Sequence, residues 1–498
     1  MRRRTYLQLA AAGGLALGGE RARATPGMEA TQRARLAPGD GDADDTFGAV
    51  VALDGGRAVV GAPADEDPSG AGGGSASVFE RGDDGWTERA KLAPEDGGEG
   101  DRFGHAVAVE GDRVVVGAPR EGLASGADGG AAYAFERGDD GWTERAKFAP
   151  KDGDADDRFG TAVALEGDRV LATAPGDEDP DGPGAGSVYE FERVDGEWLE
   201  RAKLAANTGD SHDRFGSAVD LGDDHAVIGA DRDEDPNGAE AGSAYVYEYS
   251  SIGWTEEAKL VAENGNDGDR FGAGVALDGG RAVVGAPGDE FPNGDGAGSA
   301  YVFERTGDDE WTERTKLAPA DGDSGDRFGT AVALDGDRAL VTAPADEDPK
   351  GADGGSASVF GRAGGAWREG ATLALADGDV GDRLGTGVAL DGGRALLGAA
   401  GDADPNGDGA GAAYVFDLES SPAAPTGTAA RSTPMGSPPE AGTATPGGDT
   451  ETRAAATPTG AGTGTPAAAD TTAAGGPGFG VAPLAAVLGW LLWRGRGE

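Results

Sequence analysis

Short apolar runs alternate with turns rich in Gly and Asp along most of the chain, in a fixed order. In one unit, residues 271–277 form a short apolar segment, and a tight turn of the hairpin kind, Asp278-Gly-Gly280, follows it. Residues 281–287 are a continuous apolar run, and residues 299–305 are dense in β-branched and aromatic side chains. With residues 311–317, the pattern predicts four strands in each unit.

The fourth strand of the unit is charged on one side. Trp311, Thr315 and Leu317 share one face of it, whereas Thr312, Arg314 and Lys316 share the other, because side chains alternate along a strand. A charged outermost strand protects a sheet from edge-to-edge aggregation. Four antiparallel strands with such an outer edge, repeated radially, are typical of a propeller blade.

The unit is repeated seven times. Its first strand begins with a Phe-Gly pair, or with Leu-Gly in the last copy, at residues 47, 103, 159, 215, 271, 328 and 384. The copies are 56 residues apart, with one step of 57. A Gly-Ala-Pro motif follows each pair, intact at residues 61, 117 and 285 and altered at 173, 229, 342 and 398. A period of this length indicates one copied supersecondary unit.

The repeats are offset in a way that predicts closure. Six fourth strands begin at a Trp, although there are seven Phe-Gly or Leu-Gly starts. The missing strand lies at the other end, where residues 31–38 match residues 87–94, with Ala30 at the Trp position. Residues 31–38 would complete the last blade, whose own strands span residues 384–418. A linear solenoid needs no such exchange, so we expect an all-β, closed seven-bladed propeller of four-stranded antiparallel blades over residues 29–419.

Phe-Gly followed by Gly-Ala-Pro resembles the FG-GAP repeat family, whose best-known members form the seven-bladed head of integrin α chains. The resemblance covers residues 31–418 and implies an adhesion or recognition function. Integrin-type repeats often carry Asp-x-Asp-x-Asp-Gly calcium loops between the first two strands. Here that connection is short, as in Asp54-Gly55-Gly56, and it cannot wrap an ion, so this calcium site is not carried over.

The repeat region is strongly acidic. Residues 29–419 contain 84 Asp and Glu against 33 Lys and Arg, a net charge of −51, while the whole chain carries −48. Such self-repulsion is screened at molar salt, where the Debye length is about 3 Å. The charge is spread over every repeat, which favours a halophilic surface over a patch for one basic partner and excludes nucleic acid as a partner. The chain has no Cys, so thiolate metal sites and disulfides are absent.

The two ends of the sequence predict the cellular location of the protein. Residues 1–24, with Arg2-Arg3-Arg4 before an apolar run, resemble a twin-arginine signal peptide; a membrane-anchored N-terminus is the alternative. Residues 420–476 are rich in Thr and Pro, as in an extended stalk. Residues 477–498 resemble an archaeal PGF-type sorting signal with a short apolar helix, and a weak transmembrane tail is the alternative. We therefore expect a haloarchaeal protein on the extracellular face of the membrane, in the cell envelope, held by a C-terminal lipid anchor or segment.

Acidic loops are the best candidates for a metal site. The loop between the second and third strands contains carboxylates at close spacing with Gly nearby, and calcium takes six to eight oxygen ligands from such loops. A second acidic loop precedes each Phe-Gly pair, as at residues 40–45 and 152–157. Solvated acids with bound sodium or potassium are the alternative, and no cofactor is required. The candidate calcium ligands are Asp65, Asp67, Asp177, Asp179, Asp233, Asp235, Asp289, Asn293, Asp346, Asp348, Asp402 and Asp404.

The sequence contains little that is typical of an enzyme active site. The three His residues occupy unrelated repeat positions, and no Gly-x-Ser-x-Gly motif or phosphate loop is present. The Trp series fits packing between blades better than a sugar platform. We expect a monomeric, non-enzymatic propeller that recognises a cell-surface protein or a polysaccharide. A secreted polysaccharide-acting enzyme and a structural envelope component remain as alternatives.

Overall fold

The computed structural model describes residues 28–122, 128–178, 180–290, 292–307, 310–347, 351–376, 378–403 and 406–420. The predicted signal peptide, stalk and C-terminal sorting signal lie outside these residues. Within them the secondary structure is all β, and the structure contains no helix with the length and apolar character needed to cross a bilayer.

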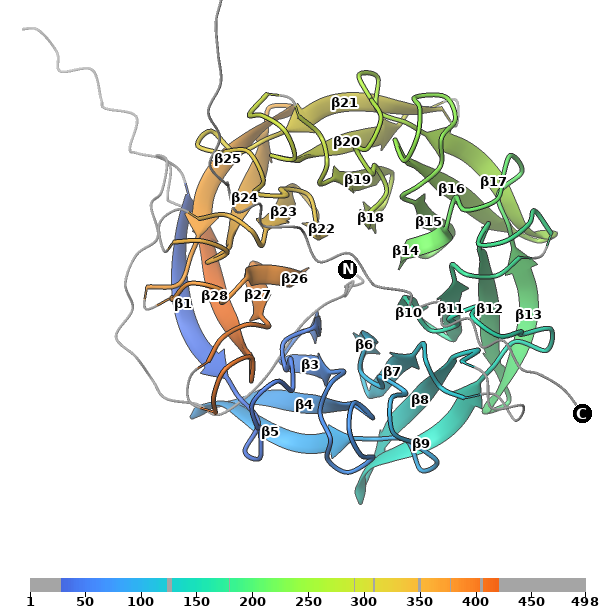
Figure 1. The fold of residues 1–498 in the computed structure, drawn as a ribbon, viewed down its shortest axis with the longest axis vertical. Coiled ribbons are helices and arrows are strands. Elements are labelled where there is room, and N and C mark those ends of the chain that lie inside the picture. Colours follow the sequence, from blue (N-terminus) through green and yellow to red (C-terminus); the bar gives the residue numbers. More distant parts are fainter. Residues whose placement is uncertain are drawn as a thin grey trace, which may run out of the picture. The chain divides into compact units, whose positions relative to one another are not determined.

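Seven four-stranded antiparallel sheets surround a central axis in the described part of the chain (Figure 1). This confirms the predicted seven-bladed propeller. The inner strand of each blade follows a Phe-Gly or Leu-Gly pair or contains it: β2 (Val50–Asp54), β6 (Ala106–Glu110), β10 (Val163–Glu166), β14 (Phe215–Leu221), β18 (Gly274–Asp278), β22 (Val332–Asp335) and β26 (Leu384–Asp391). The second strand carries the Gly-Ala-Pro copy at its end: β3 (Arg57–Ala62), β7 (Arg113–Ala118), β11 (Arg169–Ala174), β15 (His225–Ala230), β19 (Arg281–Ala286), β23 (Arg338–Ala343) and β27 (Arg394–Ala399).

The third and outer strands complete each blade. The third strands are β4 (Ser75–Gly82), β8 (Ala131–Gly138), β12 (Ser187–Val194), β16 (Ser243–Ser250), β20 (Ser299–Arg305), β24 (Ser356–Ala363) and β28 (Ala412–Ser420). The outer strands are β5 (Gly85–Leu92), β9 (Gly141–Phe148), β13 (Glu197–Leu204), β17 (Gly253–Leu260), β21 (Trp311–Leu317), β25 (Ala366–Leu373) and β1 (Met28–Leu36). We number the blades 1 to 7 from β2 to β26.

The N-terminal strand completes the last blade, as the sequence offset predicts. β1 pairs antiparallel with β28, placing Ala30 opposite Leu418 and Leu36 opposite Ala413. The strand begins at Met28, three residues before the predicted start, and Ala30 is buried. The pairing gives β28 its outer neighbour, so blade 7 has four strands like the others.

The Phe of each Phe-Gly pair packs inside its blade. Phe103 meets Tyr133 and Phe135 of the third strand edge to face, at ring-centroid distances of 5.6 and 5.9 Å. Such aromatic pairs add about 1 kcal/mol beyond burial of their area. Each of the six Trp side chains that begin the outer strands packs against a buried core cluster or belongs to one, which supports the packing interpretation of the Trp series.

The glycine of Gly-Ala-Pro lets neighbouring blades touch through their backbones. A Cβ atom on Gly117 would lie 2.0 Å from the carbonyl oxygen of Gly160, in the next blade, and the same contact recurs between Gly61 and Gly104. No side chain fits in that space.

The two Thr-Ala-Pro copies have a structural explanation. Thr173 Oγ1 accepts a hydrogen bond from the Ala162 N–H at 3.0 Å, and Thr342 Oγ1 accepts one from the Ala331 N–H at 3.1 Å. In these blades, the third and sixth, the hydroxyl satisfies a backbone donor directly before the inner strand. In these two copies, Thr thus replaces Gly and adds a hydrogen bond that stabilises the blade.

Candidate functional site: acidic loops at one face

The predicted calcium ligands divide into buried and exposed residues. Asp67 and Asp235 are exposed, and Asn293 is half-buried, with its amide donating to the Pro319 carbonyl at 3.0 Å. Asp179, Asp348 and Asp404 lie outside the described residues. The first Asp of each loop is 0 to 4% exposed in five blades and part of a hydrogen-bonded group in the sixth: Asp65, Asp177, Asp233, Asp289, Asp402 and Asp346.

A cationic side chain from the outer strand already meets these buried carboxylates. The Lys91 ammonium lies 2.8 Å from Asp65, and Lys203 lies 2.9 Å from Asp177. The same pairs form between Lys259 and Asp233, Lys316 and Asp289, Lys147 and Glu121, and Arg35 and Asp402, at 2.6 to 2.8 Å. The sequence analysis assigned Lys316 to a charged outer face, but its ammonium turns inward to a carboxylate. The sequence signal for this contact was the Lys that recurs directly before the last Leu of the outer strand.

Hydroxyl groups of the third strand bind the same carboxylates. Tyr189 donates to Asp177 and Tyr245 donates to Asp233, both at 2.6 Å, while Ser75 donates to Asp65. Burial, followed by the adjacent carboxylates, raises the pKa of each of these two tyrosines, so they remain hydrogen-bond donors. Protein donors therefore satisfy an oxygen that a calcium ion would also need.

A second set of buried acids lies two residues before each Phe-Gly or Leu-Gly pair. Their members are Asp45, Asp101, Asp157, Asp213, Asp269, Asp326 and Asp382, all at most 8% exposed. Each accepts a hydrogen bond from the backbone N–H three residues earlier, such as Asp42 N to Asp45 at 2.7 Å. The sequence analysis identified this acidic loop but did not single out these residues.

Burial raises the pKa of this second set. For Asp45, burial raises the pKa to about 7, and the nearby Asp65 and Glu66 carboxylates add to the increase. For Asp157, Asp269 and Asp326 the pKa rises to about 6, again through burial and then through the loop acids of the same blade. These acids therefore bind a proton at higher pH than an exposed Asp does, or they attract a cation.

Four blades share a buried carboxylate oxygen without a hydrogen-bond partner, and in blade 1 it belongs to a group of acids close enough to hold a cation. In blades 1, 3, 5 and 6, one oxygen of the second-set Asp is buried with no hydrogen-bond partner among the described residues: Asp45, Asp157, Asp269 and Asp326. In these blades the loop acid is followed by a Glu. Carboxylate oxygens of Asp45, Asp65 and Glu66 lie within 4.8 Å of one another. This donor set consists of oxygens, as calcium prefers, although it differs from the predicted set by including Asp45 and Glu66.

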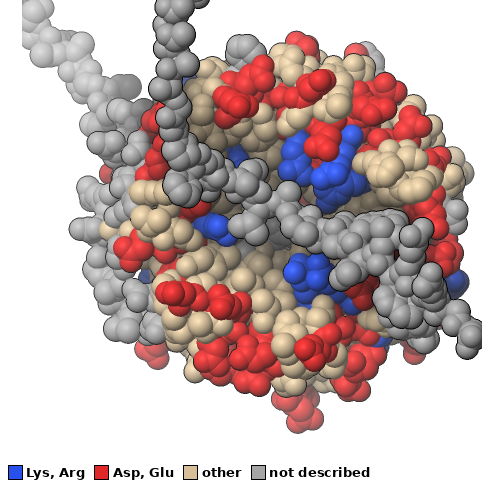
Figure 2. Space-filling model, viewed as in Figure 1, with Lys and Arg blue, Asp and Glu red and all other residues tan. Residues whose placement is uncertain are grey.

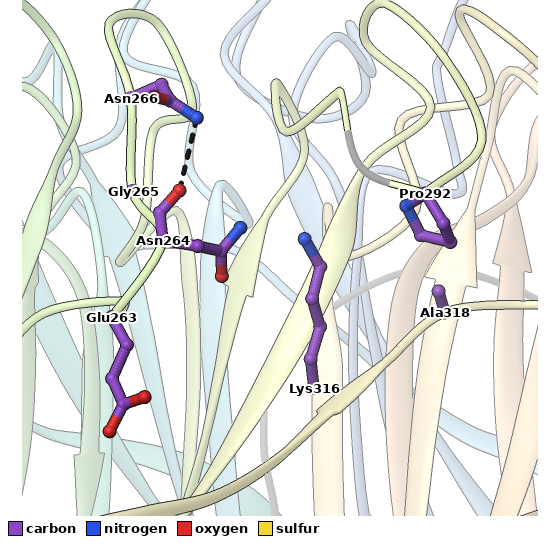
Figure 3. Close-up of a pocket in the computed structure, with 7 residues that line it drawn as sticks. All are labelled: Glu263, Asn264, Gly265, Asn266, Pro292, Lys316 and Ala318. Atoms are coloured by element: carbon purple, nitrogen blue, oxygen red, sulfur yellow. Dashed lines mark hydrogen bonds between the residues drawn. The ribbon is translucent and has the colours of Figure 1, made fainter.

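Blade 5 also borders an open cleft (Figure 3). The cleft has a volume of about 790 Å³ and lies between Asn264 and Asn266 on one side and Pro292 on the other, with Lys316 between them. Asn264 occupies the position of Asp96 and Asp152, which pair with Lys147 and Lys203 in earlier blades. The cleft is thus a local variant of the repeated acidic loop.

The repeats match a known family over most of the chain. The FG-GAP repeat family matches residues 30–79, 86–135, 142–191, 198–247, 254–303, 311–360 and 367–416. The chain belongs to the FG-GAP repeat family. Each FG-GAP unit begins on an outer strand and ends on the third strand of the next blade, so the offset that closes the ring is part of the family unit. A comparison with curated proteins found no match.

Proposed function

We propose that this FG-GAP propeller is an exported, membrane-anchored module that recognises a cell-surface protein or a polysaccharide at the cell envelope. The family membership and the seven-bladed fold support a recognition or adhesion function. The proposed binding surface is the face that carries the two acidic loops of every blade. The twin-arginine signal, the stalk and the sorting signal remain predictions from the sequence.

One observation carries this proposal: the loops of that face form a continuous hydrogen-bonded belt. Phe103 N donates to the Gly73 carbonyl of the preceding blade at 2.8 Å, and equivalent bonds join all the later blades. Asp44 N donates to the Asp408 carbonyl at 2.9 Å, which links blade 7 to blade 1. Loops held in this way lose little conformational entropy on binding, and preorganisation of this kind improves affinity.

Calcium is the second part of the proposal. Asp45, Asp65 and Glu66 in blade 1 would bind it with carboxylate oxygens, which lie within 4.8 Å of one another. The unpartnered buried oxygen of Asp45 supports this assignment. A bound ion would neutralise the acids and stiffen the junction between the two loops of a blade.

The recognition proposal is tested by binding of the full chain to cell-envelope preparations at molar salt. A Glu66→Gln/Asp67→Asn variant changes the loop face, and an Asp83→Asn/Asp84→Asn variant makes the same charge change in the turn at the other end of the strands. We expect the first variant alone to change the affinity. Binding that neither variant alters, or turnover of an envelope polysaccharide without stable binding, would argue against the proposal.

A further inference from the structure

Arginine precedes the Phe-Gly or Leu-Gly pair in six of the seven blades, and Thr46 takes this place in blade 1. The six are Arg102, Arg158, Arg214, Arg270, Arg327 and Arg383. All have left-handed backbone conformations, with φ between 56° and 60°. A residue with a Cβ atom adopts this conformation at a cost of about 1 kcal/mol. Because they directly precede the inner strands, these arginines lie near the axis of the ring.

Two further arginines enlarge this group on one side. Arg120 follows the Gly-Ala-Pro copy of blade 2, and Arg232 is at the same position in blade 4. Partial desolvation of the otherwise exposed side chain and the Arg120 charge lower the pKa of Arg102. Burial also lowers the pKa of Arg214 against the opposing effect of Asp231, and the charges of Arg232, Arg270 and Arg158 add to the decrease. We call Arg102, Arg120, Arg158, Arg214, Arg232 and Arg270 the arginine cluster.

The cluster contrasts with the rest of its face. Figure 2 shows acidic side chains over the outer part of the face and groups of Lys and Arg around the centre. Asp231 lies among the cluster and pairs with Arg214 at 3.3 Å and with Arg270 at 2.8 Å. It replaces the Pro of Gly-Ala-Pro in blade 4, where the sequence had already broken its pattern.

Half of the cluster has no acidic partner. Arg102, Arg120 and Arg158 are exposed, and they make no ion pair within the part of the chain that the structure describes. In contrast, the strand arginine Arg57 contacts both Glu80 and Asp112, and Arg113 contacts Asp168. Free guanidinium groups are unexpected where acids outnumber bases by 84 to 33. They leave hydrogen-bond donors available at the centre of the face.

Guanidinium groups bind carboxylate and sulfate through paired, charge-assisted hydrogen bonds. The exposed large apolar side chains among the described residues are Leu199, Ile252 and Val380, none of them in the cluster. The anchors of protein interfaces combine Arg with Trp and Tyr, whereas the cluster contains arginine alone. At molar salt the repulsion from the acidic rim is screened within about 3 Å, whereas direct contacts persist.

We propose that the arginine cluster binds the carboxylate or sulfate groups of an acidic polysaccharide. The inference rests on the proposed recognition function and names the chemistry of its ligand. The polysaccharide lies across the centre of the face, with its anionic groups on Arg102, Arg120 and Arg158, while Asp231 holds Arg214 and Arg270 in place.

The test measures binding of the full chain to dextran sulfate, polygalacturonate, neutral dextran and poly-glutamate at molar salt. The test variant is Arg102→Asn/Arg158→Asn, because Asn tolerates the left-handed conformation. The control, Arg81→Gln/Arg368→Gln, removes two exposed arginines elsewhere. We expect one acidic polysaccharide to bind the wild-type chain, a loss of about tenfold or more in the test variant, and no loss in the control. Dextran sulfate and polygalacturonate distinguish sulfate from carboxylate as the group recognised.

Other outcomes would overturn the inference. These are equal losses in both variants, equal binding of neutral dextran, and tighter binding of poly-glutamate than of either polysaccharide. If neither polysaccharide binds but envelope binding persists, the inference fails while the recognition function stands. If envelope binding is also absent, the recognition function fails as well. Thermal unfolding of both variants checks that each remains folded.

Discussion

The inner wall of the propeller and its loop face are built from the same repeat, but they hold together differently. At the inner wall, blades meet backbone to backbone, as where Gly117 lies against the Gly160 carbonyl. At the loop face, charged side chains meet, as where Lys203 contacts both Asp177 and Asp152. The backbone contact leaves no space for any side chain, whereas the ion pair requires only an opposite charge on a side chain that is long enough.

The copies vary accordingly. The loop acid is Glu121 in blade 2, and the outer-strand Lys becomes Thr372 in blade 6 and Arg35 in blade 7. Where the inner-wall Gly is replaced, as by Thr173, the next blade starts its inner strand earlier, at Phe215, and its register shifts. Variation at the wall therefore requires a backbone change, and variation at the loop face requires only a different partner.

The largest expected effect tests the inner wall. Gly117→Ala would place a Cβ atom 2.0 Å from the Gly160 oxygen, so the blades must separate. We expect a loss of about 3 kcal/mol or more in the free energy of unfolding, comparable to overpacking a close-packed core. Gly122→Ala has no atom within 4 Å of the new Cβ and serves as the control. Equal unfolding midpoints for the two variants in urea would refute the contrast between wall and loops.

The next effect tests the buried ion pairs of the loop face. Lys203→Met leaves Asp177, which is 4% exposed, without its ammonium partner. Removing one member of such a pair costs about 2 kcal/mol here, less than in a dry core, because the Lys side chain is 24% exposed. Arg201→Met breaks the exposed pair with Glu192 and should cost under about 1 kcal/mol. Chemical denaturation of both variants would show whether the two costs differ.

The third prediction concerns how the stability of the chain depends on pH through the buried acids of the loop face. The pKa of Asp45 is raised to about 7 by burial, so the folded chain binds more protons than the unfolded chain between about pH 4 and 7. Its contribution to stability therefore falls as the pH rises through that window. With EDTA present, we expect acidification from pH 8 into this range to raise the unfolding temperature. Asp96, whose pKa is lowered by Lys147 despite its partial burial, acts in the opposite direction at lower pH.

We expect calcium to take the place of the proton on Asp45 when the pH is high. If Asp45, Asp65 and Glu66 bind calcium, the ion raises the unfolding temperature at pH 8 and loses its effect as Asp45 becomes protonated. Asp45→Asn removes the buried charge, and we expect it to stabilise the calcium-free chain at pH 8 by about 1 to 2 kcal/mol. Calorimetric titration at high salt gives the number of ions bound. No saturable binding in the wild-type chain would exclude calcium from these acids.

The smallest effect comes from adding an ammonium group beside the loop acid of blade 6. Blade 6 resembles blade 1, since Ser356 contacts Asp346 as Ser75 contacts Asp65, but Thr372 stands where blade 1 has Lys91. Thr372→Lys should therefore gain about 1 kcal/mol through a new ion pair with Asp346. Thr372→Met adds a side chain of similar length without the charge. An equal gain from both would show that packing, rather than charge, limits this position.

Local sequence determined the strands, the number of blades and the closure of the ring. Alternation of apolar and polar residues specifies strands within a few residues, and the absence of Trp at Ala30 identified the exchanged strand. These features depend on short segments and on their repetition, both visible in one dimension. The sequence did not predict the ion pairs of the loop acids, because Lys203 and Asp177 are far apart in the chain and meet only when the outer strand folds beside the loop.

The tertiary structure decided which charges meet. Arg214 and Arg270 come from adjacent blades and share Asp231 only because the ring brings the inner strands together. The same closure gathers Arg102, Arg120 and Arg158 at the centre of an acidic face. Sequence repetition makes the blades alike, and the convergence of their inner ends on one axis turns small differences between blades into a distinct surface.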